Sequence, residues 1–258
     1  MPTALVTGAS AGIGAAFCRH LASDGHHLIV VARDGARLAE RRAVLLSLGA
    51  PEVEVLAADL TDPDDRRRVA DRLADTARPI DLLVNNAGKA IGKEFVAIGE
   101  DEIVSQLELN VTAVMLLTHA ALPAMLQRNH GGVINVASIA GLLPGRGSTY
   151  SASKAWVIAF SEGLSVACKG SGVRVQAVCP GFVRTEFHDR AGIDMSTTKD
   201  WMYVDIDEVV RTALSGLRRN RPLTIPGRLN RTIAGAAKLA PRALVRAVAN
   251  KVDAKPRT

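Results

Sequence analysis

Apolar positions along the chain follow two spacings. Short, almost continuous apolar runs, typical of strands buried on both faces, occur at 3–7, 28–32, 52–57, 81–84, 132–137 and 174–179. Longer segments with apolar residues three or four positions apart, typical of amphipathic helices, occur at 15–23, 36–48, 63–77, 103–128, 150–168 and 207–217. Residues 223–225 form a candidate seventh strand. Strands and helices therefore alternate along the chain.

This alternation predicts the fold class and the place of the ligand site. Parallel strands require crossover connections, which are right-handed when a helix makes them. We therefore expect an α/β protein with one open, doubly wound parallel sheet of the Rossmann type and helices on both faces. Ligands of such sheets bind beyond the carboxyl ends of the strands. Because no linker or repeat divides the chain, we expect one dinucleotide-binding and catalytic domain over 1–226, followed by a basic helical extension over 227–258.

The composition of the 258 residues agrees with this fold class and narrows the chemistry. Hydrophobic residues make up 48% and aromatic residues only 3%, so Ala, Val, Leu and Ile must form most of the core. Cys18, Cys168 and Cys179 lie far apart and lack metal-ligand spacing, so we expect neither a disulfide framework nor a metal site. Neither a secretion signal nor an apolar run of the roughly 18 residues that span a bilayer is evident, so we expect a cytoplasmic protein.

The net charge of +6 comes from the carboxyl-terminal part of the chain. Residues 218–258 contain eleven Lys or Arg and one Asp. Pro241 can begin a helix there, with an apolar stripe and a basic face. Such a helix either docks on the body or another subunit, which we favour, or makes a peripheral contact with an anionic membrane. We expect no nucleic-acid binding, because no recognised binding fold or aromatic pattern accompanies the charge.

A glycine-rich turn joins the first strand to the first helix. Gly8, Gly12 and Gly14 would allow a tight turn and let the backbone approach a pyrophosphate. The positive end of the following helix dipole favours that negative charge. The spacing G-x-x-x-G-x-G differs from the dehydrogenase fingerprint G-x-G-x-x-G, so the turn alone is weak evidence for a nucleotide site.

Tyr150, Lys154 and Ser138 form the candidate catalytic set. Tyr150 and Lys154 are four residues apart on a predicted helix and therefore share one face. We expect the ammonium group to lower the pKa of the phenol from its usual value of about 10, so that Tyr150 serves as general acid or base. Ser138 follows the strand 132–137 and should polarise a substrate oxygen at the same sheet edge.

Five motifs occur in a set order along the chain. They are Thr7-Gly8-Ala9-Ser10-Ala11-Gly12-Ile13-Gly14, Asn85-Asn86-Ala87-Gly88, Ser138, Tyr150-x-x-x-Lys154 and Pro180-Gly181. In order and spacing the sequence strongly resembles the short-chain dehydrogenase/reductase superfamily, over residues 3 to about 225. The resemblance implies hydride transfer between a nicotinamide cofactor and a carbonyl or secondary alcohol, in a homodimer or homotetramer built through long helices.

The resemblance also assigns roles to individual residues. Lys154 would bond the nicotinamide ribose as well as assist Tyr150, and Asn110 would anchor a water beside the lysine. Ala32 stands where NAD-using relatives typically carry Asp, and Arg33 follows it, so NADP is favoured over NAD. The alternative is a solvated Arg33 with Asp34 as a ribose acceptor. The remaining cofactor contacts implied are Gly8, Ser10, Gly12, Ile13, Gly14, Asp59, Leu60, Asn86, Ala87, Gly88, Tyr150, Lys154, Pro180, Gly181, Val183 and Thr185.

The aperiodic segment 186–203 is the candidate substrate lid. It carries much of the scarce large apolar surface, together with Leu142 and Leu143, and such lids exclude water from a site. These residues indicate a fairly apolar substrate, although packing of the lid onto the body would explain them equally well. His188 is the histidine best placed to meet substrate. Two rival hypotheses remain: an inactive NADP(H)-sensing regulator, and a membrane-surface enzyme acting on lipid-like substrates.

Overall fold

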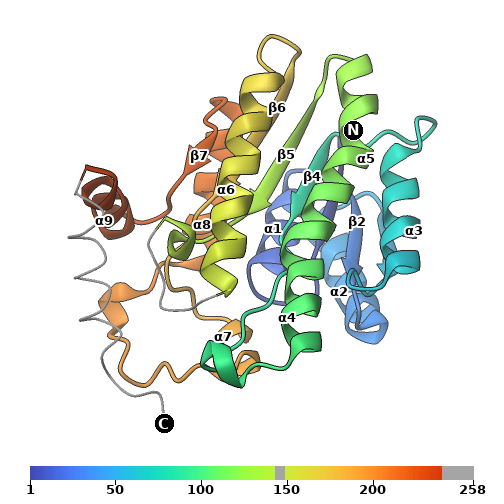
Figure 1. Ribbon diagram of the computed structural model, residues 1–258. Helices are drawn as coiled ribbons and strands as arrows, with labels where there is room; N and C mark the ends of the chain where they lie inside the picture. Colours follow the sequence, from blue (N-terminus) through green and yellow to red (C-terminus); the bar gives the residue numbers. More distant parts are fainter. Residues whose placement is uncertain (143–148, 240–258) are drawn as a thin grey trace.

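A seven-stranded parallel sheet forms the centre of the protein, in the order β3-β2-β1-β4-β5-β6-β7 (Figure 1). The computed structural model describes residues 1–142 and 149–239. The strands are β1 Thr3–Thr7, β2 His27–Ala32, β3 Val53–Ala57, β4 Leu82–Asn85, β5 Gly131–Val136, β6 Val173–Val178 and β7 Leu223–Thr224. The predicted doubly wound α/β fold is therefore confirmed, including the seventh strand.

Helices cover both faces of this sheet, as the spacing of apolar residues predicted. One face carries α1 Gly12–Ser23, α2 Gly35–Ser47 and α8 Ile206–Arg218. The other carries α3 Pro63–Ala74, α5 Ala113–Gln127 and α6 Thr149–Ala167. Side chains of β1 alternate between the two layers, because Ala4 and Val6 join one core cluster and Leu5 joins the other. Burial on both faces explains why the strands read as continuous apolar runs.

The helix predicted at 103–128 is longer than expected and contains an irregularity. It comprises α4 Glu100–Leu107, a π-helical segment Glu108–Thr112 and α5, without a break. By length and by the mean hydropathy of an 18-residue window within it (1.6), the run Glu100–Gln127 could cross a membrane. It lies on the sheet, however, and Leu117, Ala121 and Met125 join the core beneath it. Packing on the sheet thus accounts for the buried part of its apolar surface.

The segment predicted as a lid leaves the sheet after β6 and returns to it. It contains α7 Phe187–Arg190 and a short 3₁₀ turn, Asp200–Met202. The Val204 N–H donates to the Phe182 carbonyl at 2.8 Å, beside a bridge between Phe182 and Tyr203. These contacts hold the beginning and the end of the segment together, close to the carboxyl end of β6.

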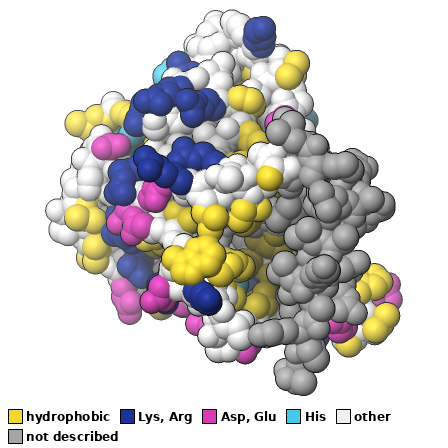
Figure 2. Space-filling view, turned by 90° about the vertical axis from the view of Figure 1, so that its left-hand side faces the viewer, with side chains coloured by type: hydrophobic (Ala, Val, Ile, Leu, Met, Phe, Trp, Pro, Cys, Tyr) yellow, Lys and Arg dark blue, Asp and Glu magenta, His cyan; other side chains and the backbone are white. Residues whose placement is uncertain are grey.

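The carboxyl-terminal extension begins with α9, Arg228–Leu239, which the sequence did not predict as a separate helix. Asn230 is buried and donates to the Pro226 carbonyl at 3.0 Å, and it lies against Gly181. The helix predicted from Pro241 lies outside the described residues. Basic side chains gather on the face seen in Figure 2. Arg218, Arg219 and Arg221 are exposed and lie between α8 and β7, at the amino end of that strand.

Candidate active site

The glycine-rich turn lies where β1 ends, and its geometry explains each of its three glycines. Gly8 and Gly12 have φ of +66° and +54°, in the left-handed region that favours glycine. A Cβ at Gly14 would lie 2.2 Å from the Gly8 carbonyl oxygen and 2.5 Å from Asn86 Nδ2. The Gly8 carbonyl and the Asn86 side chain therefore fill the space beside Gly14. They leave no room for any side chain at position 14.

The amino end of α1 offers unpaired donors just beyond this turn. Ala11 at the N-cap contributes no side-chain bond, and no described residue accepts from the N–H groups of Gly12, Ile13 or Gly14. Such N–H groups, with the positive end of the helix dipole, form a site for an anion. The turn and helix end fit the diphosphate of a dinucleotide, and these residues, with Ser10, would hold it.

Asn86 and Ala87 connect this turn to the end of β4. The N–H groups of Asn86 and Ala87 both donate to Thr7 Oγ1, at 2.9 and 3.0 Å, and Asn86 Nδ2 donates to the Thr7 carbonyl at 3.0 Å. Thr7 thus joins two strand ends beneath the cofactor site. The motif includes Thr7, but sequence reasoning gave it no role.

A second polar network lies beneath the same edge and was missed by sequence reasoning. Asn85 Nδ2 donates to Thr118 Oγ1 at 3.0 Å and to Asn135 Oδ1 at 2.9 Å, and Asn135 Nδ2 donates to Ser161 Oγ at 2.9 Å. All four side chains are buried. The network ties β4, β5, α5 and α6 together, and so fixes α6, which carries the tyrosine and lysine, relative to the sheet.

Arg33 extends into solvent from the end of β2. Its side chain is 74% exposed, and its nearest described acidic partner is Asp59, whose Oδ2 lies 3.9 Å from Nη1. Both charges act on Lys89. Burial lowers the pKa of Lys89 most, the charge of Arg33 lowers it further, and the charge of Asp59 raises it. The predicted neighbour Leu60 points away, since its side chain is buried in the core. Arg33 and Lys89 therefore supply positive charge at this end of the site.

Tyr150 and Lys154 lie on one face of α6, as predicted, and Ser138 meets them from the end of β5. The Ser138 side chain lies beside Tyr150 and acts to lower the pKa of the phenol. Lys154 Nζ donates to the Val136 carbonyl at 2.7 Å and lies 5.8 Å from the centre of the Tyr150 ring. Three side chains from two elements thus converge at the carboxyl edge of the sheet.

Burial sets the acidity of both groups. It raises the pKa of the Tyr150 phenol to about 12, against a smaller lowering by the Ser138 hydrogen bond. It lowers the pKa of Lys154 to about 8. The expectation that the pKa of Tyr150 lies below its usual value is therefore wrong, because the loss of hydration outweighs the effects of the neighbouring groups. Sequence spacing revealed the pair but not its burial.

Lys154→Met should change how stability depends on pH. Below pH 8 Lys154 is charged in both folded and unfolded chains, so its burial destabilises the fold. Between about pH 8 and its usual value of 10.5 the folded chain holds it neutral while the unfolded chain still binds the proton. Raising the pH there relieves the penalty by up to about 1.4 kcal/mol per unit. The stability advantage of Lys154→Met should therefore shrink from pH 8 to 10 in urea unfolding, and a constant difference would contradict this.

Asn110 occupies the π-helical segment and is fully buried. Its Oδ1 accepts from the Lys89 N–H at 2.9 Å, and its Nδ2 donates to the Lys89 carbonyl at 2.9 Å and to Ser153 Oγ at 3.2 Å. Ser153 Oγ in turn donates to the Tyr150 carbonyl at 2.7 Å. The amide therefore links the segment after Gly88 to α6. The water-anchoring role remains a prediction.

Gly88 lies beside both Asn110 and Lys154. A Cβ there would lie 3.2 Å from Asn110 Oδ1 and 3.4 Å from Lys154 Nζ. Three predicted site residues thus surround one space. They are Gly88 after β4, Asn110 in the long helical run and Lys154 on α6. Any larger side chain at position 88 would enter this space.

The segment after β6 covers this space. The Ile139 N–H donates to the Pro180 carbonyl at 3.0 Å, which joins it to the strand end that carries Ser138. The Thr185 methyl lies 3.1 Å from where a Cβ at Gly12 would be, so Thr185 lies over the glycine-rich turn. Val183, in contrast, is buried in the core, so its side chain faces away. Of the predicted nicotinamide contacts, Thr185 is the side chain placed over the cofactor site.

One lid residue reaches the catalytic set, and a second packs beside it. The ring of Phe187 lies 5.7 Å from that of Tyr150, centre to centre, and His188 packs against Phe187 and Phe182. Burial lowers the pKa of His188, which favours its neutral form. Leu142, after Ser138, is partly buried against the core cluster that includes Val157, and Leu143 lies outside the described residues.

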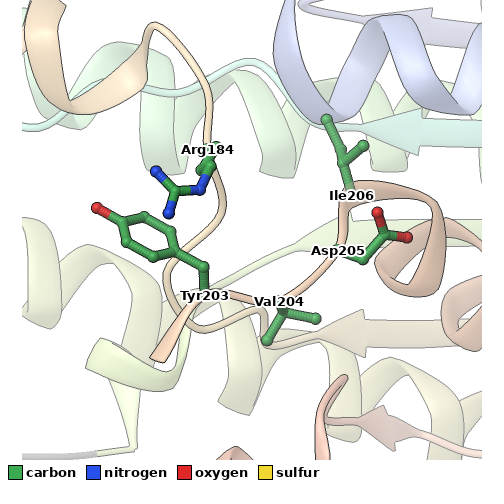
Figure 3. Close-up of a pocket in the computed structure, with 5 residues that line it drawn as sticks. All are labelled: Arg184, Tyr203, Val204, Asp205 and Ile206. Carbon is green, nitrogen blue, oxygen red and sulfur yellow. The ribbon is translucent and has the colours of Figure 1, made fainter. Parts of the chain in front are cut away.

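Other apolar lid residues lie elsewhere. Trp201 is exposed, and Tyr203 stacks under Arg184, whose guanidinium carbon is 4.2 Å from the ring centre. Figure 3 shows this pair in a surface cavity that Val204, Asp205 and Ile206 complete. None of the residues lining that cavity belongs to the catalytic set. The lid therefore divides into a part that faces Tyr150 and a part that lies away from the catalytic set.

Comparison with known proteins agrees with this geometry. Residues 2–196 match the family model described as short chain dehydrogenase. Oxidoreductase UcpA of Salmonella typhimurium is 35% identical over 186 residues, which cover 71% of this chain and 70% of the relative.

Solved structures give the same result. A short-chain dehydrogenase from Sphingobium yanoikuyae in complex with NADPH is 38% identical, with a TM-score of 0.83 over 94% of this chain and 98% of the other. A bulky-bulky ketone specific alcohol dehydrogenase from Comamonas testosteroni is 32% identical, with a TM-score of 0.79 over 94% and 96%. The chain belongs to the short-chain dehydrogenase family and is an oxidoreductase.

Proposed function

We propose that the protein is an NADP-dependent oxidoreductase that moves a hydride between the nicotinamide and the carbon of a ketone or secondary alcohol with apolar substituents. The observation that carries the proposal is the convergence of Tyr150, Lys154 and Ser138 at the sheet edge where the glycine-rich turn presents unpaired N–H groups. A bound NADPH would supply the hydride that reduces the carbonyl carbon.

The side chains of this chain complete the reduction by handling the proton. Ser138 donates a hydrogen bond to the substrate oxygen as negative charge develops on it. Tyr150 transfers its phenolic proton to that oxygen, and the electron pair of the broken carbonyl π bond forms the new O–H bond. A pKa of about 12 keeps the phenol protonated at neutral pH, as an acid requires. The Lys154 ammonium stabilises the phenolate that remains.

Arg33 supports NADP as the cofactor. Its exposed guanidinium follows Ala32, where no carboxylate stands to repel a phosphate, and its contact with Asp59 is long. A guanidinium can bind a 2′-phosphate through two parallel hydrogen bonds. The Sphingobium relative is described in complex with NADPH.

Phe187 supports an apolar substrate. Its ring lies against Tyr150, so any substrate whose oxygen reaches the phenol must pass beside an aromatic surface. His188, held neutral by burial, adds no charge there. The Comamonas structure is described as specific for bulky ketones.

The proposal is tested by following NADPH oxidation with ketones that share one carbonyl but carry alkyl or aryl groups of increasing size. We expect turnover that rises with apolar bulk and is faster with NADPH than with NADH. Arg33→Ala is the matched variant, and it should weaken NADPH about tenfold to a hundredfold, as for a charge-assisted hydrogen bond, while leaving NADH unchanged. Tight NADPH binding without turnover of any ketone would favour the sensing regulator.

A cytoplasmic homodimer or homotetramer is the assembly we propose. Met115, Leu116 and Leu126 on α5 and Val166 on α6 are large apolar side chains exposed on the outer helices. A second copy of the chain would bury them. Sedimentation velocity measures the resulting mass.

A further inference from the structure

An ion pair joins α2 to the lid across 149 residues of sequence. Arg37 Nη1 donates to Glu186 Oε2 at 3.0 Å, and Nη2 donates to Oε1. The two bonds run in parallel, which is the strongest arrangement of a guanidinium and a carboxylate. Arg37 is 29% exposed and Glu186 is 45% exposed, so water partly screens the pair.

Glu186 is held charged by two arginines. The hydrogen bond from Arg37, above all, lowers its pKa to about 2, and the charge of Arg190 contributes. Arg190 lies one turn further along α7 and also donates to Oε2. Arg190 belongs to the lid itself. Of the two arginines, Arg37 is therefore the one that connects Glu186 to the body of the protein.

On the body side, Arg37 is anchored next to the expected phosphate site. Asp34, the N-cap of α2, accepts from the Arg37 N–H at 2.9 Å and directly follows Arg33. Arg33 is exposed with a long contact, whereas both terminal nitrogens of Arg37 are engaged. The two arginines, four residues apart, thus have different partners.

On the lid side, Glu186 stands between the two residues that reach the site. Thr185 lies over Gly12, and Phe187 lies against Tyr150. Thr185 Oγ1 also accepts from the Phe187 N–H at 3.3 Å, so these three residues form one tightly folded unit. Moving Glu186 would therefore move the cover of the glycine-rich turn and the ring beside the catalytic tyrosine together.

We propose that Arg37 is a positioning residue, which through Glu186 holds residues 185–187 across the cofactor cleft and so retains the dinucleotide and places Phe187. This inference rests on the proposed nucleotide-binding function. Arg37 acts on the lid and makes no contact with the 2′-phosphate. Arg37 holds residues 185–187 over the diphosphate, which NADPH and NADH share. Arg37 therefore slows the release of both dinucleotides.

The test uses the full-length variants Arg37→Ala, Glu186→Gln and their combination. In the protein without cofactor, hydrogen exchange of the amides of residues 184–190 should accelerate about fivefold in each single variant, the size expected of a partly exposed ion pair. The double variant should be no faster than either single variant, since both remove one interaction. Release of NADPH and of NADH, followed by fluorescence after a chase, should accelerate by the same factor of about five.

Three matched variants separate the alternatives. Arg41→Ala removes the same charge from the same helix and should change neither exchange nor release. Arg190→Ala should leave release nearly unchanged, because the Arg37 bonds remain. Arg33→Ala should accelerate NADPH release alone.

Two results would overturn the proposal. The first is unchanged hydrogen exchange at 184–190 in Arg37→Ala. The second is faster release of NADPH but not NADH in Arg37→Ala, with no effect of Glu186→Gln, which would make Arg37 a phosphate ligand. If the wild-type protein binds neither dinucleotide, the proposed function fails, while the exchange measurement still decides whether the ion pair holds the lid.

Discussion

Tyr150→Phe should reduce kcat for ketone reduction by about 10²–10⁴ or more, because the variant loses the phenolic proton that the proposed reduction transfers to the substrate oxygen. The ring that packs against Phe187 and below the Lys154 ammonium remains. The affinity for NADPH should therefore stay within about twofold of wild type, since the change removes one oxygen atom far from the diphosphate turn. Steady-state rates and fluorescence titration measure the two effects separately.

The chain offers a matched control, because it contains one other tyrosine. Tyr203 stacks with Arg184 in the surface cavity of Figure 3, so Tyr203→Phe should retain nearly full activity. Equal rates for Tyr150→Phe and wild type would refute the assignment of the proton donor. Equal losses in the two variants would indicate that removing either hydroxyl disturbs the fold.

Gly14→Ala should weaken NADPH binding by at least about tenfold and destabilise the fold by about 1–3 kcal/mol, as when a group is forced into a filled space. The new methyl would lie 2.2 Å from the Gly8 carbonyl oxygen, so the turn would have to open. Opening it would move the N–H groups that await the diphosphate. Titration with NADPH and urea unfolding measure the two effects.

Gly163→Ala provides the comparison within α6. Nothing lies within 4 Å of a Cβ at Gly163, so the change should leave binding unaltered and stabilise the helix by up to about 1 kcal/mol. Wild-type NADPH affinity in Gly14→Ala would show that the turn does not form the diphosphate site.

The fold was predictable because its determinants are local. The apolar runs that became β1 and β2 and the helical spacing of α3 and α8 are visible in short windows, and alternation then leaves few topologies. The catalytic pair was predictable for the same reason, because a spacing of four on one helix fixes a shared face.

Features made by contacts between distant segments were not predictable. Arg37 and Glu186 are ordinary charged residues in sequence, and the fold alone brings them together. The acidity of Tyr150 depends on burial by other elements, so spacing gave the wrong direction for its pKa. The side chains of Leu60 and Val183 face the core although their neighbours border the site, and only the folded path of the loops after β3 and β6 decides this.

The π-helical segment Glu108–Thr112 affects more than the placement of Asn110. A π turn holds one extra residue, so the residues before it are rotated by about 100° relative to those of an uninterrupted helix. The spacing that places residues of α5 on one face of the helix therefore does not continue into α4. Deleting one residue near 110 would make the helix regular, yet it would turn the surface of α4 toward a different neighbour. The number of residues between Gly88 and α5 is thus constrained by the buried amide, even where the side chains themselves are free to vary.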